Sequence, residues 1–228
     1  MIRVGHKGAD HVAPGNTAAS FEAALEHGVD MIEFDVLRTR DGRLVLAHDY
    51  ADSEQRECLT LEQGLELFAG EAYNGVELDV DLKLPGYERD VVEGLSRHGL
   101  TERSLVSTMY PESLDRLGEL APSMRRGWSV PRVRRNYLTA PFYIRVPALA
   151  LAVWMRVRMP SLAARRIRAG GCEAIMSHQV LVSGRLVRAV HGAGGQLYVW
   201  TVDEAPKIRA LEAVGVDGVI TNDPRLFD

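Results

Sequence analysis

Two carboxylates separated by a single residue stand in the apolar segment 31–36. Side chains alternate across a β-strand, so Glu33 and Asp35 would share one face while the three apolar residues that alternate with them face the other way. Like charges this close need a compensating cation, or one carboxyl group stays protonated. A half-exposed strand with a solvated acidic face is the alternative interpretation.

A second acidic strand is predicted over residues 76–83, where apolar and charged residues alternate strictly. The charged positions include Asp79, Asp81 and Lys83. An alternating strand of this kind presents all its charges to one face and its apolar side chains to a core. Taken alone, Lys83 could simply neutralise Asp79 or Asp81.

A hairpin is predicted to return the chain to the first acidic pair. Asp41 and Gly42 separate two apolar runs, and an Asp-Gly pair favours a two-residue turn because glycine accepts a positive φ. In that register His48 lies across from Asp35, with the Cβ atoms roughly 5 Å apart. A one-residue bulge would shift this pairing.

Strands that alternate with helices along the whole chain predict a parallel sheet with right-handed crossovers. About eight such units in 228 residues favour a (β/α)8 TIM barrel, formed by residues 1–228 as a single domain. An open doubly wound sheet is the alternative, but its central strands are apolar on both faces. The expected strands are residues 2–5, 31–36, 76–83, 104–107, 126–130, 173–176, 196–202 and 217–221.

Several helix boundaries are also predicted from local signals. Asn16 is expected to cap a helix that ends near Gly28, and Thr60 to open a helix with a capping box. Ser161 is expected to cap a helix that ends at residues 170–171. Residues 131–160, which contain several prolines, are expected to be irregular.

Composition limits the class of protein. Hydrophobic residues make up 46% of the chain, enough for one substantial core, and the net charge is −4. There is no signal peptide and no run of 18 uncharged apolar residues, so we expect a protein that does not span a membrane. Two cysteines suggest a reducing compartment, and we therefore expect a cytoplasmic location. Nothing resembles a nucleic-acid-binding module.

Eight short motifs occur in an order that resembles the glycerophosphodiester phosphodiesterase family. They are Gly-His-Lys-Gly at 5–8, Ala-Pro-Gly-Asn-Thr at 13–17, Ile-Glu-Phe-Asp at 32–35, Asp-Gly at 41–42, His-Asp at 48–49, Asp-Leu-Lys at 81–83, Trp-Thr-Val at 200–202 and the segment 215–221. The resemblance implies a TIM barrel that cleaves glycerophosphodiesters to glycerol 3-phosphate and an alcohol with one divalent cation.

The resemblance also implies roles for individual residues. The metal ligands would be Glu33, Asp35 and Asp81, and the acid–base pair would be His6 and His48. Lys83 would bind the substrate phosphate, with Lys7 beside it. Carboxylate oxygens suit Mg²⁺ or Ca²⁺.

Three positions depart from the family pattern. Lys7 stands where the family has arginine, Gly15 where it has glutamate, and Asp81 where it usually has glutamate. Lysine keeps the charge of arginine but not its bidentate geometry. Two alternatives therefore stay open: a phospholipase D-like enzyme acting on choline- or ethanolamine-bearing lysolipids, and a catalytically silent binder of phosphorylated ligands.

Two aromatic positions lie near a predicted strand end. Trp200 shares its parity with Tyr198 and Val202, so all three should lie on one face, and we expect Trp200 to form a platform for substrate carbons at the barrel mouth. Plain core packing is the alternative. His178, which also follows a strand, is the one further histidine that merits attention.

The arginines are distributed unevenly. Residues 120–172 contain eleven arginines and no acidic residue, a formal +11, whereas the rest of the chain carries −15. The same segment holds an apolar run around Trp154, so we predict a surface beside the active site that docks on anionic lipid, with peripheral attachment to a membrane. A helix-packing face or an oligomer contact is equally compatible, and no oligomeric state is predicted.

Overall fold

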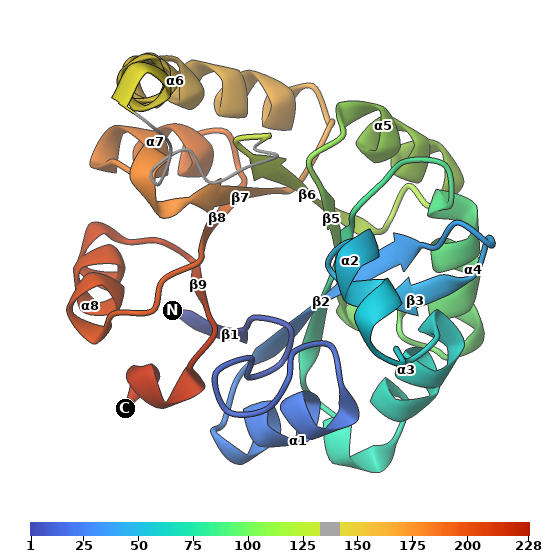
Figure 1. Cartoon of the computed structure of the whole chain (residues 1–228). Coiled ribbons are helices and arrows are strands. Elements are labelled where there is room, and N and C mark those ends of the chain that lie inside the picture. Colours follow the sequence, from blue (N-terminus) through green and yellow to red (C-terminus); the bar gives the residue numbers. More distant parts are fainter. Residues whose placement is uncertain (133–141) are drawn as a thin grey trace.

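Parallel strands form a closed ring in the computed structural model, which describes residues 1–132 and 142–228 (Figure 1). Adjacent strands pair in the order β1-β9-β8-β7-β6-β5-β4-β2, and β1 also pairs with β2, which closes the barrel. The strands are β1 Ile2–Gly5, β2 Met31–Arg38, β4 Glu77–Leu82, β5 Ser104–Thr108, β6 Arg125–Val130, β7 Ala174–His178, β8 Gln196–Trp200 and β9 Gly218–Thr221. The predicted TIM barrel is confirmed and the open sheet is excluded.

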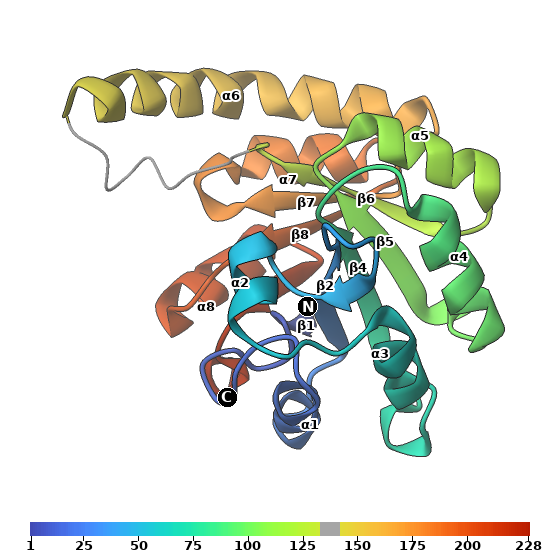
Figure 2. The same ribbon diagram turned by 45° about the vertical axis from the view of Figure 1, so that its right-hand side comes forward.

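Helices surround the ring (Figures 1 and 2). They are α1 Ala18–Glu26, α3 Leu61–Phe68, α4 Glu88–Arg97, α5 Pro111–Leu120, α6 Phe142–Arg168, α7 Gly184–His191 and α8 Ala205–Val214. A short antiparallel strand, β3 Leu44–Leu46, and the helix α2 Tyr50–Gln55 form an excursion after β2. Among the described residues, no helix combines the length and the apolar character that crossing a membrane requires.

The two faces of β2 separate as their alternation predicts. Phe34 is fully buried on the outer face, where its ring stacks on Phe68 of α3 at 4.9 Å between centroids, and Phe68 also packs on Phe21 of α1. Burial of such side chains holds the helices against the barrel, and removing one ring to alanine costs roughly 3–5 kcal/mol. Glu33 and Asp35 consequently point into the barrel.

Strand register brings the acidic residues of β2 and β4 side by side. In this parallel pair Glu33 is opposite Asp79 and Asp35 is opposite Asp81. Below them the barrel interior is filled by apolar side chains: Val4, Met31, Leu105, Ala174, Met176, Tyr198 and Ile220. The carboxylates therefore lie directly above a packed apolar layer of the barrel interior.

The predicted hairpin register is wrong by one residue. Val36 pairs with Leu46 and Arg38 with Leu44, so the connection is a three-residue loop, 40–42, rather than the two-residue turn. Gly42 adopts φ 89° at the end of this loop, as three-residue hairpins with a left-handed last residue require. Since β3 ends at Leu46, His48 lies beyond the paired ladder and not across from Asp35.

The expected boundaries of two helices are also corrected. Thr17, not Asn16, caps α1 and forms a capping box with Ser20. Ser161 lies inside α6, which begins at Phe142, so 142–160 are helical and not irregular, while 133–141 fall outside the described residues. Alanine, leucine, methionine and arginine dominate α6, and their helix propensity together outweighs the cost of its two interior prolines, roughly 3 kcal/mol each. The capping box of Thr60 and Gln63 is present as predicted.

Candidate active site

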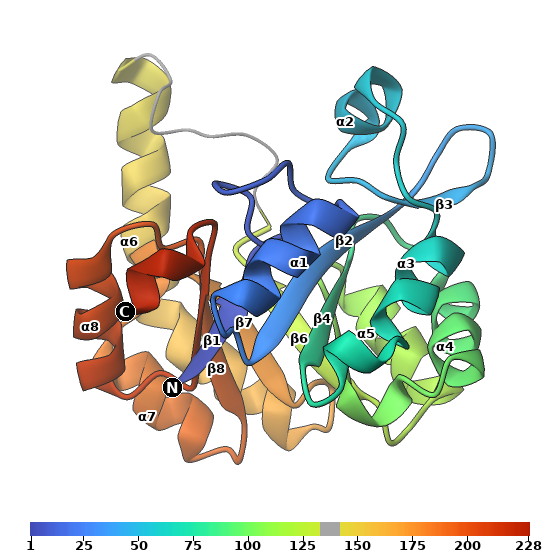
Figure 3. The same ribbon diagram turned by 90° about the horizontal axis from the view of Figure 1, so that it is seen from below.

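Three carboxylates meet at the carboxyl ends of β2 and β4, the end of the barrel where TIM-barrel enzymes carry their active sites. One oxygen each of Glu33, Asp35 and Asp81 lies within 4.8 Å of the other two. Asp35 is fully buried and Glu33 is almost so. The loop after β1 and the β3–α2 excursion rise beyond the strand ends around this point (Figure 3).

A single lysine sits among these acids. Lys83 Nζ lies 2.5 Å from Asp35 Oδ1 and 2.6 Å from Asp81 Oδ2. Burial opposes the ionisation of Asp35, but the charge of Lys83 outweighs it and keeps the Asp35 pKa below its usual value. Burial, and next the charge of Asp35, raise the pKa of Glu33 well above its usual value.

The donor set fits a divalent cation. One lysine cannot balance three clustered carboxylates, and burial together with the charge of Asp35 raises the pKa of Glu33, so a cation at this point would favour its ionised form. Asp81 Oδ1 is buried without a hydrogen-bond partner, so it offers an unused acceptor. Hard oxygen donors of this kind suit Mg²⁺ or Ca²⁺.

A fourth carboxyl group, that of Asp79, lies opposite Glu33 in the strand pair, two residues before Asp81 on β4. It is buried, and burial raises its pKa to about 8, so it is protonated at neutral pH. A protonated carboxyl group adds no negative charge beneath the site. This distinguishes Asp79 from Asp81, although both are odd-numbered positions of the same alternating strand.

His6 follows β1 and is held through a chain of hydrogen bonds. Asn222 donates its Nδ2–H to Asp203 at 2.7 Å, so its Oδ1 faces His6 Nδ1 at 2.5 Å. Since Oδ1 can only accept, Nδ1 carries the proton of a neutral His6 and Nε2 is left with a lone pair. That Nε2 lies 3.8 Å from Glu33 Oε2, and burial lowers the His6 pKa.

His48 reaches the mouth from the opposite side, on the β3–α2 excursion. Its side chain is 55% exposed, and its Nδ1 lies 3.1 Å from Asp49 Oδ2. His48 is near enough to Asp35 to be one of the charges that lower the Asp35 pKa. The structure thus brings both predicted histidines to the carboxylate cluster, although the ladder does not place His48.

Lys7 contributes more through its backbone than its ammonium group. Its N–H donates to Glu33 Oε2 at 2.8 Å, in a loop where Lys7 has φ 51°. Its Nζ lies 2.5 Å from Asp10 Oδ2. The side chain of Lys7 is therefore engaged by a carboxylate in the absence of substrate.

Asp10 occupies the space in front of Gly15. The Gly15 N–H donates to Asp10 Oδ1 at 2.8 Å, and a Cβ at position 15 would come within 2.4 Å of that oxygen. A glutamate, the family residue at this position, could not fit beside Asp10. The two departures at positions 7 and 15 are therefore linked, since Asp10 pairs with Lys7 and excludes a side chain at 15.

The mouth is also lined by Trp200 and His178, whose rings pack edge to face at 5.0 Å. Trp200 donates Nε1–H to the Met176 carbonyl at 2.8 Å, which fixes its ring. His178 Nδ1 accepts the Val180 N–H at 3.2 Å, and burial lowers its pKa.

The prediction that Tyr198, Trp200 and Val202 share one face is wrong for Val202. β8 ends at Trp200, and beyond it Val202 turns into the core between barrel and helices. Tyr198 has the parity of Trp200 but is fully buried in the barrel interior instead of lining the mouth. Trp200 alone remains partly exposed at the end of the strand.

Asn16 was missed as a site residue because it resembles a helix cap. It is fully buried, with φ 59°, and its amide faces Asp35. Asn222 was missed because it is 216 positions from His6. Asn16 does lie in the family motif at 13–17, next to the Pro-Gly turn, whereas Asn222 lies in none of the eight motifs.

Comparison with known proteins gives the family. The model of the glycerophosphoryl diester phosphodiesterase family matches residues 6–83 and 59–226, which together span nearly the whole chain. The chain belongs to this family. A glycerophosphodiester phosphodiesterase from Caldanaerobacter subterraneus subsp. tengcongensis is 26% identical over 263 residues, covering 97% of this chain and 93% of the relative.

Solved structures of family members share the fold. A putative glycerophosphoryl diester phosphodiesterase from Silicibacter pomeroyi superposes with a TM-score of 0.77 at 19% identity, covering 99% of this chain and 91% of the other. A phosphodiesterase from Oleispira antarctica, solved with sn-glycerol-3-phosphate, has a TM-score of 0.72 at 21% identity, covering 99% and 94%.

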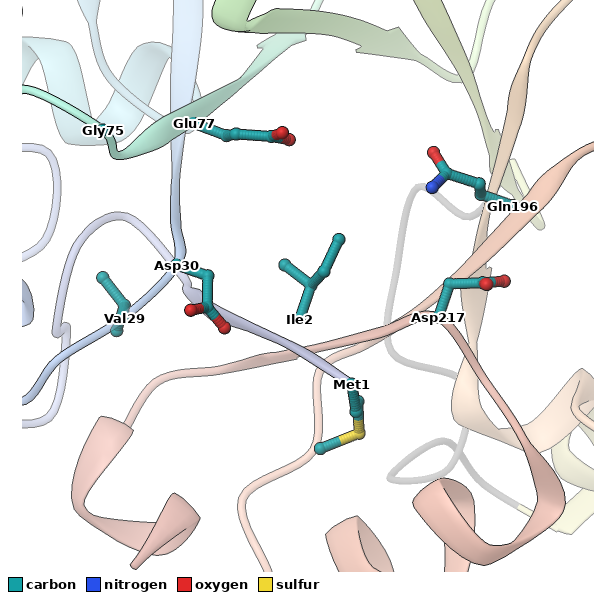
Figure 4. Close-up of a pocket in the computed structure, with 8 residues that line it drawn as sticks. All are labelled: Met1, Ile2, Val29, Asp30, Gly75, Glu77, Gln196 and Asp217. Atoms are coloured by element: carbon teal, nitrogen blue, oxygen red, sulfur yellow. The ribbon is translucent and has the colours of Figure 1, made fainter.

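A separate pocket opens at the amino-terminal end of the barrel, away from the site (Figure 4). It is lined by the acidic residues Asp30, Glu77 and Asp217 among others. Each acid is already engaged: Asp30 accepts the Arg3 N–H, Glu77 pairs with Arg125, and Asp217 pairs with His191. This pocket lies at the opposite end of the barrel from the carboxylate cluster and is not part of the candidate active site.

Proposed function

We propose that this family member hydrolyses glycerophosphodiesters to glycerol 3-phosphate and an alcohol at the carboxyl end of its barrel. The observation that carries the proposal is the cluster of Glu33, Asp35 and Asp81, with His6 Nε2 3.8 Å from Glu33 and His48 close to Asp35. The product bound in the Oleispira antarctica phosphodiesterase supports glycerol 3-phosphate as the product here.

Glu33, Asp35 and Asp81 would together hold one divalent cation, either Mg²⁺ or Ca²⁺. Such an ion offsets the negative charge of a phosphodiester and lowers the pKa of an attacking oxygen. Lys83, between two of these carboxylates, is placed to contact a phosphate oxygen, and Lys7 would do so after leaving Asp10.

His6 is the base in this scheme. Its Nε2 lone pair takes the proton from the attacking hydroxyl, of water or of the substrate, as that oxygen bonds to phosphorus. His48 is the acid in this scheme, with its ring oriented by the contact of its Nδ1 with Asp49 Oδ2. The proton of His48 goes to the alkoxide that leaves when the bond between phosphorus and the oxygen of the departing alcohol breaks. Trp200 offers its ring to the carbon atoms of the substrate.

Lysophospholipids are a proposed extension of the substrate range. Exposed apolar side chains of α6, among them Trp154, stand beside the mouth and could receive an acyl chain. A phospholipase D-like reaction on the same substrates would give a lysophosphatidic or cyclic product instead of glycerol 3-phosphate. The silent-binder alternative predicts binding of phosphorylated ligands without turnover.

One experiment separates these possibilities. The protein is assayed with added Mg²⁺ or Ca²⁺ across glycerophosphodiesters and lysophospholipids, and the products are identified by phosphorus NMR. We expect glycerol 3-phosphate from the small diesters, loss of turnover in excess chelator, and weaker metal binding in Glu33→Gln. Full turnover in excess chelator would contradict the metal assignment. Absence of turnover with every diester and metal would contradict the proposed function.

A further inference from the structure

The first half of α6 stands away from the barrel (Figures 2 and 3). The carboxyl-terminal half of the helix is anchored, because Met159, Ala163 and Ile167 are buried against the core that α7 also covers, and Met155, one turn earlier, packs partly buried on the same core. Toward its amino-terminal end the helix extends past the carboxyl ends of the strands. The β3–α2 excursion rises on the other side of the mouth, so the site lies between the two.

The projecting turns carry large apolar side chains in the open. Leu151 is 55% exposed, Val153 65%, and Trp154 and Val157 both 56%. At 100° of rotation per residue these four side chains fall within an arc of about 160° on one face of the helix. That face is opposite the one on which Met159, Ala163 and Ile167 are buried. A soluble surface helix exposes its polar face only, so this exposure indicates a surface that meets another apolar phase.

The charge around these side chains is exclusively positive. Arg156 and Arg158 are exposed, and among the described residues no carboxylate lies within 4.0 Å of either. Arg158 lies over the Trp154 ring at 5.6 Å. By contrast, Arg125, Arg126 and Arg166 pair with Glu77, Glu173 and Asp115 elsewhere on the barrel. Within the basic surface predicted over 120–172, Arg156 and Arg158 are thus the exposed arginines that lie among the exposed apolar side chains, whereas Arg165 and Arg168 are exposed on the anchored part of α6.

This surface is continuous with the active-site mouth. Arg156 donates to the Val180 carbonyl at 3.4 Å, and Val180 is itself 42% exposed. The Val180 N–H holds His178, whose ring packs on Trp200 at the mouth. We define the α6 patch as Leu151, Val153, Trp154, Arg156, Val157, Arg158 and Val180.

We propose that the α6 patch docks on the surface of an anionic lipid bilayer and presents the mouth to it. Tryptophan, short apolar side chains and arginines without acidic partners form the combination that binds at the boundary between headgroups and acyl chains. A symmetric contact with a second copy would set these arginines against one another. The docking is independent of catalysis; only its consequence, access to lipid-borne diesters, rests on the proposed function.

The test is flotation with vesicles of phosphatidylcholine that contain increasing fractions of phosphatidylglycerol. Arg156→Glu/Arg158→Glu is compared with Arg188→Glu/Arg209→Glu, which makes the same charge change at exposed arginines of α7 and α8. We expect binding to rise with phosphatidylglycerol, to fall at molar salt, and to drop by at least about tenfold in the patch variant, since each basic residue near an anionic surface changes partitioning on the order of fivefold. Trp154→Ser should weaken binding even at low salt.

Other outcomes overturn the proposal. These are no binding to anionic vesicles at low salt, equal losses in the patch and control variants, or patch-dependent self-association in sedimentation velocity without vesicle binding. Circular dichroism checks that all variants fold. Turnover of a small soluble diester is measured separately and should be unchanged in the patch variant. Absence of that activity in the unmutated protein would contradict the proposed function but would not affect the conclusion drawn from vesicle binding.

Discussion

The side-chain amide of Asn16 clamps Asp35 through two hydrogen bonds, one to its carboxylate and one to its backbone. Its Nδ2 donates to Asp35 Oδ2 at 2.8 Å, and its Oδ1 accepts the Asp35 backbone N–H at 3.0 Å. Both residues are fully buried, and Asn16 holds φ 59°, a region that asparagine tolerates better than most residues. The clamp therefore fixes one carboxylate of the cluster from a loop 19 positions earlier in the chain.

Asn16→Ala should lower the free energy of unfolding by roughly 1–3 kcal/mol, because it leaves a buried N–H and a buried carboxylate oxygen unpaired. Urea unfolding measures this loss. Asn16→Gly is the matched control: it tolerates the positive φ but also lacks the amide, so the two variants should show similar losses of metal affinity. Unchanged metal binding in both would show that the clamp does not position Asp35.

Gly15→Glu should impair folding and turnover, because its Cβ would come within 2.4 Å of Asp10 Oδ1. Asp10→Ala on its own should fold, since it removes only the ion pair with Lys7 and the hydrogen bond from the Gly15 N–H. The double variant Asp10→Ala/Gly15→Glu should recover part of the thermal stability lost in Gly15→Glu, because the contact with Asp10 is removed while Lys7 Cβ would still lie 2.8 Å from the new Cβ. Thermal melts of the three proteins check this prediction. Equal instability of single and double variants would mean that Asp10 is not what excludes a side chain at position 15.

Asp79→Asn should change how stability depends on pH. The Asp79 pKa is raised from 3.8 to about 8 in the folded chain, so between these values folding retains a proton that the unfolded chain has lost. Stability of the native chain should therefore fall relative to Asp79→Asn as pH rises from about 4 to 8, by at most about 1.4 kcal/mol per pH unit. Urea titrations with chelator present measure it. Parallel pH profiles would mean that Asp79 ionises normally.

His6→Ala should reduce kcat by roughly 10²–10⁴ with the fold retained, and His48→Ala by a similar factor. Burial lowers the His6 pKa, so the base form persists to lower pH and the acidic limb of kcat/KM should lie below 6.5. Asn222→Ala removes the acceptor that holds the proton on His6 Nδ1. It should lower kcat more than it raises KM. A near-native rate in folded His6→Ala would exclude His6 as the base.

Local patterns determined the barrel and the direction of its acidic side chains. Strict alternation in β4 and the apolar partners of Glu33 and Asp35 in β2 leave one arrangement that buries the apolar face, so the carboxylates must point inward. The capping box at Thr60 and Gln63 is equally local. Such features depend on residues a few positions apart, and these can be compared directly in the sequence.

Tertiary structure decided the rest, because it depends on which distant segments barrel closure brings together. His6 and Asn222 are in contact although they are 216 positions apart in the sequence. Asn16 binds Asp35 instead of capping α1, because the buried carboxylate requires a hydrogen-bond donor more than the end of the helix requires a cap. The loop at Gly42 moved His48 by one position, a difference too small for the turn sequence to determine. The exposure of Trp154 followed only from which face of α6 meets the core, the face that carries Met155 and Met159.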